Sequence, residues 1–428
     1  MREIELEIFI RVHWEKVGTV EFFESPQNQG LRATTHFTYH PSYIENHIDE
    51  LGCRTSAAVS VNYPINYSPI KTAGGWAPFL LDIVPSGAAR RFWLERVKRG
   101  DGPDVEIDLL TQGAINPPGN VRVVQDQKPV PARHPGFSKD DILSRDVDFM
   151  SYAALHGAWV AGSSGAPGES PKFLLVVDRQ NKWHADGAIP DQDVQSHWLV
   201  KFPRSKATRD RQILEAEAHY YSIATDLGLQ VHKPLQWQNN ALFIPRFDRL
   251  YETNQWNRLG FESLNSSLKV TEFAVSRPHE EYLAAIHEFS DRSADIEEYI
   301  LRDFVNIVMG NTDNHGRNTA FLKTSNRIEL SPLFDFAPMA YDDAGILRAT
   351  KWINEYYSVP DFKHICKVLE KLERKPHAIH DFLKDCRNRL QNIPQLMDKY
   401  KIDQDLRGHV TKKYDDFMKA LENQLEKM

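Results

Sequence analysis

Residues 310–318 bring together the side chains that phosphoryl transfer needs. They spell Gly-Asn-Thr-Asp-Asn-His-Gly-Arg-Asn, they follow an apolar helical pattern, and a further acid, Asp335, comes soon after them. In phosphoryl transfer one carboxylate accepts the proton of the nucleophile, while an Asn and a second Asp hold Mg²⁺ against the phosphates. Four residues separate Asp313 from Asn318, the same gap as in the catalytic loop of protein kinases. The segment is therefore a candidate phosphoryl-transfer loop.

Two other interpretations of this loop stay open. It could be a capped turn at the end of a helix, because Asn and Asp side chains readily bond to nearby backbone groups. It could also serve a metal hydrolase that uses Asp313 and His315, although no further His/Asp cluster in the sequence supplies ligands for two metals.

A loop of small residues and a lysine precede this site. Residues 162–168, Gly-Ser-Ser-Gly-Ala-Pro-Gly, include Ser163 and Ser164 and could surround an anion with backbone N–H groups, or form a surface loop. They lack the Walker A, GxGxxG and GxSxG patterns. Lys201 lies in the apolar run 198–202, where it could hold phosphates as a point charge or face solvent on an edge strand.

The elements that must position these residues follow from periodicity. Residues 173–177 and 198–202 are apolar runs of strand length, and 207–227 has apolar residues at helical spacing before Gly228. Glu217 on this helix could orient Lys201, as in kinases, or be an exposed helix charge. Further helical patterns cover 296–308, 362–372, 377–390 and 414–425, and 242–247 and 319–322 resemble strands.

The first third of the chain has the spacing of strands and turns. The residues from Met1 to Trp14 alternate apolar and polar side chains, and 57–61 is a short apolar run, so both are predicted to be strands. One helix is expected at 87–97, with Ser86 as its N-cap. The turn-rich passage 116–134 suggests a boundary, and we expect domains at 1–140, 141–250 and 251–428.

Composition limits the class of protein. The 428 residues include 52 Lys+Arg and 59 Asp+Glu, a net charge of −7, with 41% hydrophobic residues, which excludes fibrous and largely disordered chains. The net acidity argues against a dedicated nucleic-acid binder. Three scattered cysteines form neither a disulfide framework nor a zinc motif. Without a signal peptide or an apolar stretch of about 20 residues, we expect a cytoplasmic protein that does not enter the membrane.

Taken in order, these motifs resemble the HipA-type serine/threonine kinases, toxins of bacterial toxin–antitoxin pairs. The order of small-residue loop, strand lysine, helix, strand, catalytic-type loop and Asp is that of a bilobal kinase. The resemblance covers nearly the whole chain, including the apolar stretch Trp76–Pro85. It rests mainly on Gly162–Lys172, Lys201-Phe202-Pro203, Glu217–Gly228, Pro245-Arg246-Phe247-Asp248-Arg249, residues 310–318 and Phe334-Asp335.

The resemblance implies an α+β, bilobal kinase-like fold. A β-rich N-terminal subdomain would precede a mixed nucleotide-binding lobe and an α-helical C-terminal lobe with the catalytic loop. Pro245 departs from the family pattern, which usually has Glu there, but a proline keeps the carbonyl that could meet adenine.

The resemblance also implies roles for single residues. Asp313 would be the catalytic base, and Asn318 with Asp335 would bind Mg²⁺. Lys201 would contact the ATP phosphates with His315 beside them, and the segment around Phe247 would be the hinge that meets adenine. Either Ser163 or Ser164 would be autophosphorylated, which would repel the triphosphate by adding negative charge.

The family further implies partners and leaves alternatives. Its members phosphorylate proteins such as aminoacyl-tRNA synthetases and bind a HipB-like helix-turn-helix antitoxin, which carries them to operator DNA. Two other functions remain possible for this chain. One is a catalytically weak kinase-like binding module that acts in operator repression as the partner of its antitoxin, and the other is a small-molecule kinase.

Overall fold

The protein combines sheets and helices in two compact units. The computed structural model describes residues 2–23, 26–114, 116–124, 135–145, 148–149, 152–153 and 169–428. Unit 1 comprises Met1–Ser205, Gln236–Val275 and Phe321–Ile328, and unit 2 comprises Lys206–Leu235, Ser276–Ala320 and Glu329–Met428. The mixture of helix and sheet confirms the predicted α+β class. We predicted three continuous domains, at 1–140, 141–250 and 251–428. That division remains a prediction, and each of the two units is instead made of several stretches of the chain.

Unit 1 begins with an antiparallel sheet. Among the described residues its five strands lie in the order β4-β3-β2-β1-β5. Ile4, Leu6 and Ile8 are buried in its core, because alternate side chains of a strand point to one face. The predicted opening strand ends earlier than expected, at a turn where Arg11 and Val12 have positive φ. The strands are β1 (Arg2–Ile10), β2 (His13–Phe22), β3 (Thr35–Tyr39), β4 (Ile70–Thr72) and β5 (Val121–Val123).

Short helices accompany this sheet in the sequence. They are α1 (Pro26–Gln29), α2 (Pro41–Asn46), α3 (Gly87–Val97) and α4 (Glu106–Gly113), followed by α5 (Lys139–Arg145). The predicted helix 87–97 is confirmed, but the Ser86 side chain makes no capping hydrogen bond.

The strand predicted at 57–61 is wrong. These residues are buried in turns, and the only bridge there among the described residues pairs Ser60 with Tyr63. The reason is a buried carboxylate, since Glu262 accepts hydrogen bonds from Ser60 Oγ at 2.6 Å and from Val61 N at 2.8 Å. A side chain thus takes the place of a neighbouring strand.

The second sheet of unit 1 carries Lys201. Within the described residues its order is β7-β6-β8-β10-β9, and the pairs that involve β6, β8 and β10 are antiparallel. The predicted strands at 173–177 and 198–202 are confirmed as β6 and β8. The strands are β6 (Lys172–Asp178), β7 (Trp183–Ala185), β8 (Val194–Lys201), β9 (Gln236–Gln238) and β10 (Ala241–Pro245).

A hairpin and a short sheet follow β10. The hairpin pairs β11 (Arg249–Glu252) with β12 (Gln255–Arg258), and Thr253 and Asn254 at its turn have positive φ. Next come β13 (Gly260–Ser263) and α8 (Leu264–Ser267), and β13 forms a sheet with β14 (Ala320–Lys323) and β15 (Ile328–Leu330).

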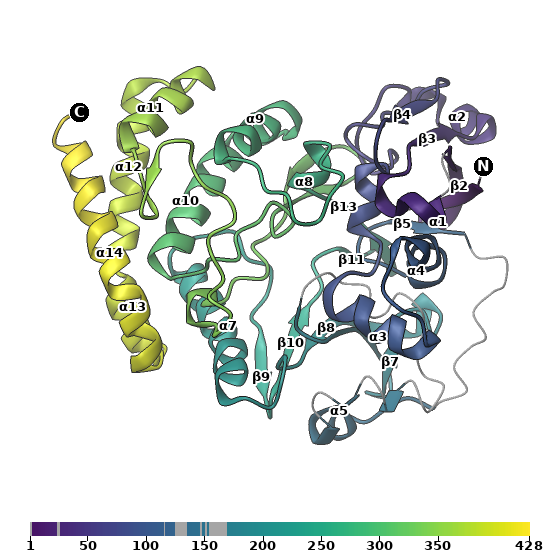
Figure 1. Ribbon diagram of the computed structural model, residues 1–428, viewed down its shortest axis with the longest axis horizontal. Helices are drawn as coiled ribbons and strands as arrows, with labels where there is room; N and C mark the ends of the chain where they lie inside the picture. The colour runs from purple at the N-terminus through teal and green to yellow at the C-terminus, as the bar shows by residue number, and fades with distance from the viewer. Residues whose placement is uncertain are drawn as a thin grey trace. The chain divides into compact units, whose positions relative to one another are not determined.

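Unit 2 is mainly helical. In Figure 1, α10, α12 and the yellow α14 lie beside one another, and aromatic rings join α10 to α11 and α14. The ring of Phe304 lies 5.5 Å from Phe362 and 5.2 Å from Phe417. The elements are α7 (Thr208–Asp226), α9 (His279–Phe289), α10 (Ala294–Val308), β16 (Glu355–Tyr356), β17 (Val359–Pro360), α11 (Phe362–Lys371), α12 (Pro376–Leu390), α13 (Ile393–Lys399) and α14 (Gln404–Leu425).

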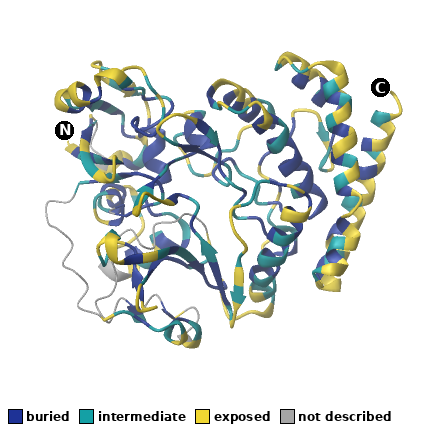
Figure 2. Cartoon of the chain, turned by 180° about the vertical axis from the view of Figure 1, so that it is seen from behind, coloured by how far each residue is buried: buried dark blue, intermediate teal, exposed yellow. Residues whose placement is uncertain are grey.

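The helices predicted from periodicity are confirmed in this unit. Gly228, just after α7, has φ +76°, a conformation that favours glycine and ends the helix. Figure 2 shows the amphipathic result, with buried and exposed residues on the same helices of the C-terminal region. The buried stripe is where they pack, as the 3.6-residue period predicts.

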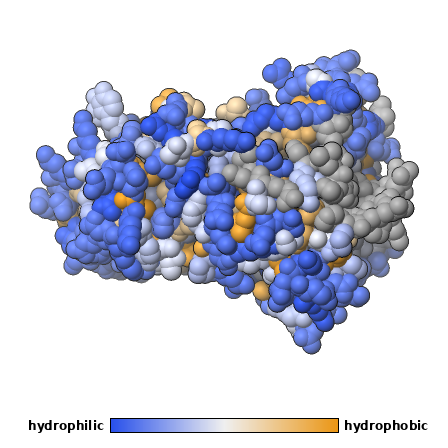
Figure 3. Space-filling model, turned by 90° about the horizontal axis from the view of Figure 1, so that it is seen from below, coloured by the Kyte–Doolittle hydropathy of each residue, from blue (hydrophilic) through white to orange (hydrophobic). Residues whose placement is uncertain are grey.

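The face of the molecule seen in Figure 3 is mostly hydrophilic. On the face drawn in Figure 3, blue residues predominate and the apolar patches are small and separate. In the described part of the chain, no helix combines the length and the apolar character that a membrane crossing requires.

Candidate active site

The catalytic-type loop, residues 310–318, starts at Gly310, just after α10 and in a fixed position. Gly310 has φ +70°, and a Cβ atom there would lie 2.6 Å from Cγ1 of Val410 in α14. Both the backbone conformation and the lack of space therefore require glycine. The N–H of Ala340 donates to the Gly310 carbonyl at 2.8 Å, which ties the start of the loop to a second segment.

Bonds within the loop hold Asp313, His315 and Asn318 together. Asn318 Nδ2 donates to the backbone carbonyl of Asp313, and Asn318 N donates to the carbonyl of His315, both at 2.8 Å. Nε2 of His315 lies 3.4 Å from Oδ1 of Asp313, and both side chains are 35% exposed. The carboxylate of Asp313 is thus held in place while it stays accessible.

Asp335 lies near Asp313, His315 and Asn318 but belongs to a later segment of the chain. Its φ of +56° is uncommon for a residue other than glycine, and such strained conformations concentrate at functional sites. Burial raises the pKa of Tyr221 on α7 well above its usual value, the nearby carboxylates of Glu217 and Asp335 raise it further, and a hydrogen bond to the Asp335 backbone opposes them. Glu217 is buried, so it is not the exposed helix charge that was one of its two interpretations.

One pocket of unit 2 is lined by Asp313, His315, Asn318 and Asp335. Asn306 and Asp303 on α10 line it as well. Asp313 and Asp335, 22 positions apart in the sequence, therefore share one small polar site with residues of α10, as phosphoryl transfer requires.

Unpaired polar atoms gather in the loop. Within the described residues, Oδ1 of Asn311, Oγ1 of Thr312 and Nδ1 of His315 are buried without a hydrogen-bond partner. Buried polar atoms are nearly always paired, and exceptions call for an explanation such as a ligand. The loop is partly the capped turn that was one interpretation, but a cap alone would not leave these atoms unpaired.

The side chains present fit Mg²⁺ with a nucleotide. Among the described residues, no group of three His, Cys, Asp or Glu side chains could hold a metal unaided. Mg²⁺, however, is usually bound through one or two carboxylates plus water and phosphate oxygens. Asn318 uses its Nδ2 for the bond to Asp313, so the carbonyl Oδ1 is the atom left for a metal.

A buried ionic cluster beside the pocket was missed by the sequence analysis. Asp303 receives two hydrogen bonds from Arg348, at 2.8 and 3.0 Å, and lies 3.0 Å from Nε2 of His279. Burial alone would raise the pKa of Asp303, but Arg348 and His279 lower it below its usual range. The signal in the sequence was an acid among the apolar residues at the end of this helix.

Unit 1 holds the other predicted nucleotide contacts. Lys201 is buried on β8, between β6 and β10, so it does not face solvent on an edge strand. Phe247 follows β10, is half-buried, and its ring lies 6.3 Å from that of Phe261. Ser163 and Ser164, with the rest of 162–168, lie outside the described residues.

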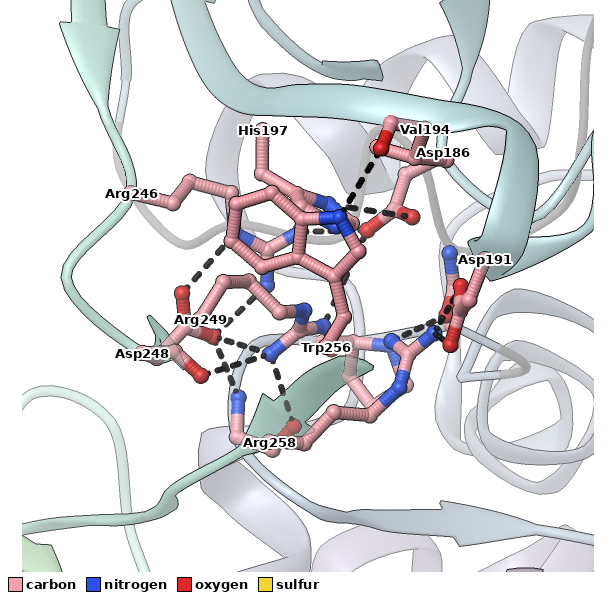
Figure 4. A network of polar contacts seen from close by, with 12 residues as sticks. Asp186, Asp191, Val194, His197, Arg246, Asp248, Arg249, Trp256 and Arg258 are labelled. Atoms are coloured by element: carbon pink, nitrogen blue, oxygen red, sulfur yellow. Dashed lines mark hydrogen bonds and ion pairs between the residues drawn. The ribbon is translucent and has the colours of Figure 1, made fainter. Parts of the chain in front are cut away.

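The Arg-Phe-Asp-Arg box forms a dense ionic network (Figure 4). Arg246 binds both oxygens of Asp248, at 2.6 and 2.9 Å, and also pairs with Asp186. Nη1 of Arg249 donates to Asp248 at 2.7 Å. The N–H of Gly119 donates to the same carboxylate at 2.8 Å, which joins the box to the end of the first sheet.

Burial and neighbouring charges shift the pKa of Asp248 in opposite directions. Burial alone would raise the pKa of Asp248, but Arg246 and Arg249 bring it below its usual range. Burial lowers the pKa of Arg249 to about 9 and that of His197 to about 3. His197 is thus neutral, covered by the ring of Trp256 with its centroid 4.6 Å away.

Sequence and structure comparisons identify the family. A model described as the HipA-like C-terminal domain matches residues 164–393, more than half of the chain. The chain belongs to the HipA-like family. This confirms the resemblance expected from the motifs, and a comparison with curated proteins finds no match.

Solved structures show the fold of this HipA-like chain. A chain of the Shewanella oneidensis MR-1 toxin–antitoxin complex of HipA, HipB and operator DNA matches it with a TM-score of 0.65 and 14% identity, over 98% of this chain and 97% of that one. The Helicobacter pylori proinflammatory kinase CtkA gives a TM-score of 0.37 and 15% identity, over 54% of this chain and 89% of that one. The first match shows that the HipA fold extends over nearly the whole chain.

Proposed function

We propose that this HipA-like chain is an ATP- and Mg²⁺-dependent kinase that phosphorylates Ser or Thr in proteins. The observation that carries the proposal is the single pocket lined by Asp313, His315, Asn318 and Asp335. Each of these residues has the type and order that phosphoryl transfer uses, and the family match supports the same chemistry.

Each side chain has a defined task in this proposal. Asp313 accepts the proton of the acceptor hydroxyl. The bond from Asn318 fixes the backbone of Asp313, and the contact with His315 keeps the carboxylate in position. Asn318 Oδ1 and the Asp335 carboxylate hold Mg²⁺, which neutralises phosphate charge when bound. Lys201 contacts the phosphates, and the backbone near Phe247 meets adenine.

The proposal includes regulation and partners. Ser163 or Ser164 is the autophosphorylated residue, and a protein such as an aminoacyl-tRNA synthetase is the substrate. A HipB-like helix-turn-helix antitoxin binds the chain and carries it to operator DNA, and the solved complex of HipA, HipB and DNA supports this kind of partner. A chain with net charge −7 then needs no basic surface of its own for that role.

The test is phosphoryl transfer by Asp313→Asn. The purified protein is incubated with γ-labelled Mg-ATP and a bacterial extract, and labelled proteins and sites are identified by mass spectrometry. A general base contributes roughly 10²–10⁴-fold, so the variant should lose transfer by that factor and still bind Mg-ATP in calorimetry. Asp381→Asn is the matched control, because its carboxylate lies on the exposed surface of α12.

Other outcomes would favour the other functions. Full activity of Asp313→Asn contradicts the assignment of the base. Binding of nucleotide without transfer by the natural protein favours the binding module that acts with an antitoxin, and label only on metabolites favours a small-molecule kinase.

A further inference from the structure

The side chain of Asn314 clamps a second segment onto the catalytic-type loop. Its Oδ1 accepts the backbone N–H groups of Ala349 at 3.0 Å and Thr350 at 3.1 Å, and its Nδ2 donates to the carbonyl of Thr350 at 2.9 Å. The amide thus bonds the backbone much as a neighbouring strand would. Asn314 is the residue next to Asp313, so the segment is fixed directly to the proposed base.

The same segment is held from its other side. Arg348 binds the buried Asp303 of α10 and also Glu355, with both Glu355 bonds at 3.1 Å. Trp352 Nε1 donates to Asp303 at 2.8 Å, and the N–H of His279 donates to the Lys351 carbonyl at 3.1 Å. The backbone of residues 348–352 is therefore attached to the loop, to α9 and to α10.

Exposed apolar side chains flank this fixed backbone on both sides in the sequence. Leu347 is 83% exposed, Ile353 66%, Tyr356 76% and Tyr357 81%, the highest values among the large hydrophobic residues of the described chain. The rings of Tyr356 and Tyr357 lie 4.4 Å apart in the β16–β17 hairpin. Exposed apolar residues that gather on one segment indicate a surface that binds another molecule.

We propose that Asn314 is a positioning residue that fixes residues 347–357 beside the proposed base, so that their exposed side chains receive the acceptor protein. The inference rests on the proposed kinase function. Its occupant is the segment of the acceptor that surrounds its Ser or Thr, because Asn314, the residue next to Asp313, holds Ala349 and Thr350, which lie between the exposed Leu347 and Ile353 in the sequence. That occupant carries apolar side chains, which Leu347 and the two tyrosines would cover.

The first test measures the clamp without any need for activity. Amide hydrogen exchange of the full chain is compared for the natural protein and Asn314→Ala. The N–H groups of Ala349 and Thr350 should exchange faster in the variant, because they lose their acceptor. Asn392→Ala is the matched control, since Asn392 also donates to a backbone carbonyl, at 3.0 Å, but far along the chain. Unchanged exchange in Asn314→Ala overturns the clamp.

The second test separates positioning from folding. With labelled Mg-ATP and extract proteins, Asn314→Ala should lower transfer about 10- to 100-fold, because small displacements of reacting groups are costly. The Kd for Mg-ATP should stay within about twofold. Asn314→Asp keeps an acceptor for the two N–H groups and should recover part of the rate. Transfer equal to that of the natural protein in Asn314→Ala overturns the proposal.

The third test addresses the exposed side chains. Leu347→Ser combined with Tyr357→Ser should lower labelling of extract proteins but leave exchange at Ala349 and nucleotide affinity unchanged. Tyr67→Ser, at an exposed tyrosine of unit 1, is the control. Undiminished labelling overturns the role of this surface. If the natural protein transfers no phosphate at all, the kinase proposal fails, while the exchange result still decides whether Asn314 is a clamp.

Discussion

Two polar regions of the molecule use the same side chains in opposite ways. The Arg246–Arg249 box in unit 1 packs two arginines and an aspartate out of contact with water, and Asp186 completes the charge balance. The loop 310–318 in unit 2 also holds an Asp and an Arg, but the side chains of its Asp313 and His315 reach solvent, each 35% exposed.

The two regions therefore have different roles: the box stabilises the fold, and the loop is suited to chemistry. Charges that are buried and paired cannot change partner cheaply, so the box is suited to fixing the backbone on both sides of Phe247. The side chains of Asp313 and His315 are accessible and can meet a ligand, and an uncommon backbone conformation such as that of Asp335 is maintained by its surroundings. Substitutions should therefore damage folding in the box and transfer in the loop.

The largest effect on folding is expected for Arg246→Met. It leaves Asp186 and Asp248 buried with too few positive partners, so the free energy of unfolding should fall by about 3–5 kcal/mol. Urea denaturation followed by fluorescence measures this change. The control is Arg11→Met, whose exposed pair with Glu50 should contribute less than about 1 kcal/mol. Similar losses in both variants would contradict the structural role of the box.

A smaller loss of about 3 kcal/mol is expected for Lys323→Met at pH 7. Nζ of Lys323 lies 3.2 Å from the buried carboxylate of Glu262, which would lose its only nearby positive partner within the described residues. Burial already raises the pKa of Glu262, so lowering the pH should protonate it and reduce the loss. The double variant with Glu262→Gln should recover stability, and a failure to recover would contradict this account.

The pH dependence of stability should reveal His197. Burial lowers its pKa from 6.5 to about 3, so protonation favours the unfolded chain. Its stabilising contribution is complete above about pH 6.5 and falls toward pH 3, by at most about 1.4 kcal/mol per pH unit. Melting temperatures between pH 7 and 4 should decline less steeply in His197→Gln than in the natural protein. His377→Gln, at an exposed histidine of α12, should leave the decline unchanged.

The smallest effect on folding is expected where the effect on transfer is greatest. Asp313→Asn should change the free energy of unfolding by no more than about 0.5 kcal/mol, because its side chain is accessible and the Asn318 bond uses its backbone carbonyl. Denaturation of the variant beside its transfer assay gives both values. A large loss of stability would mean that the loop, like the box, serves folding.

Sequence succeeded where the informative residues are neighbours in the chain. The loop 310–318 carries its own spacing, and helices such as α7 and α14 have their apolar residues on one face. The strands β6 and β8 were predicted for the same reason, since a buried strand is a short apolar run.

Sequence failed where the partners are far apart. Asp303 and Arg348 are 45 residues apart and Arg246 and Asp186 are 60 apart, so no local spacing indicates either pair. Residues 57–61 have the composition of a strand, but the distant Glu262 takes their backbone hydrogen bonds. The clamp by Asn314 was missed because its partners are backbone atoms, which any sequence could supply.

The contact between Gly310 and Val410 links the loop to a helix a hundred residues further along the chain. The start of the loop and the surface of α14 fit so closely that a methyl group added at Gly310 would overlap Val410. In protein engineering, α14 must therefore be treated as a support of the site, although it contributes no residue to the pocket. A bulkier side chain at position 410 or removal of α14 would therefore disturb the start of the loop at Gly310, which has no side chain that could move aside.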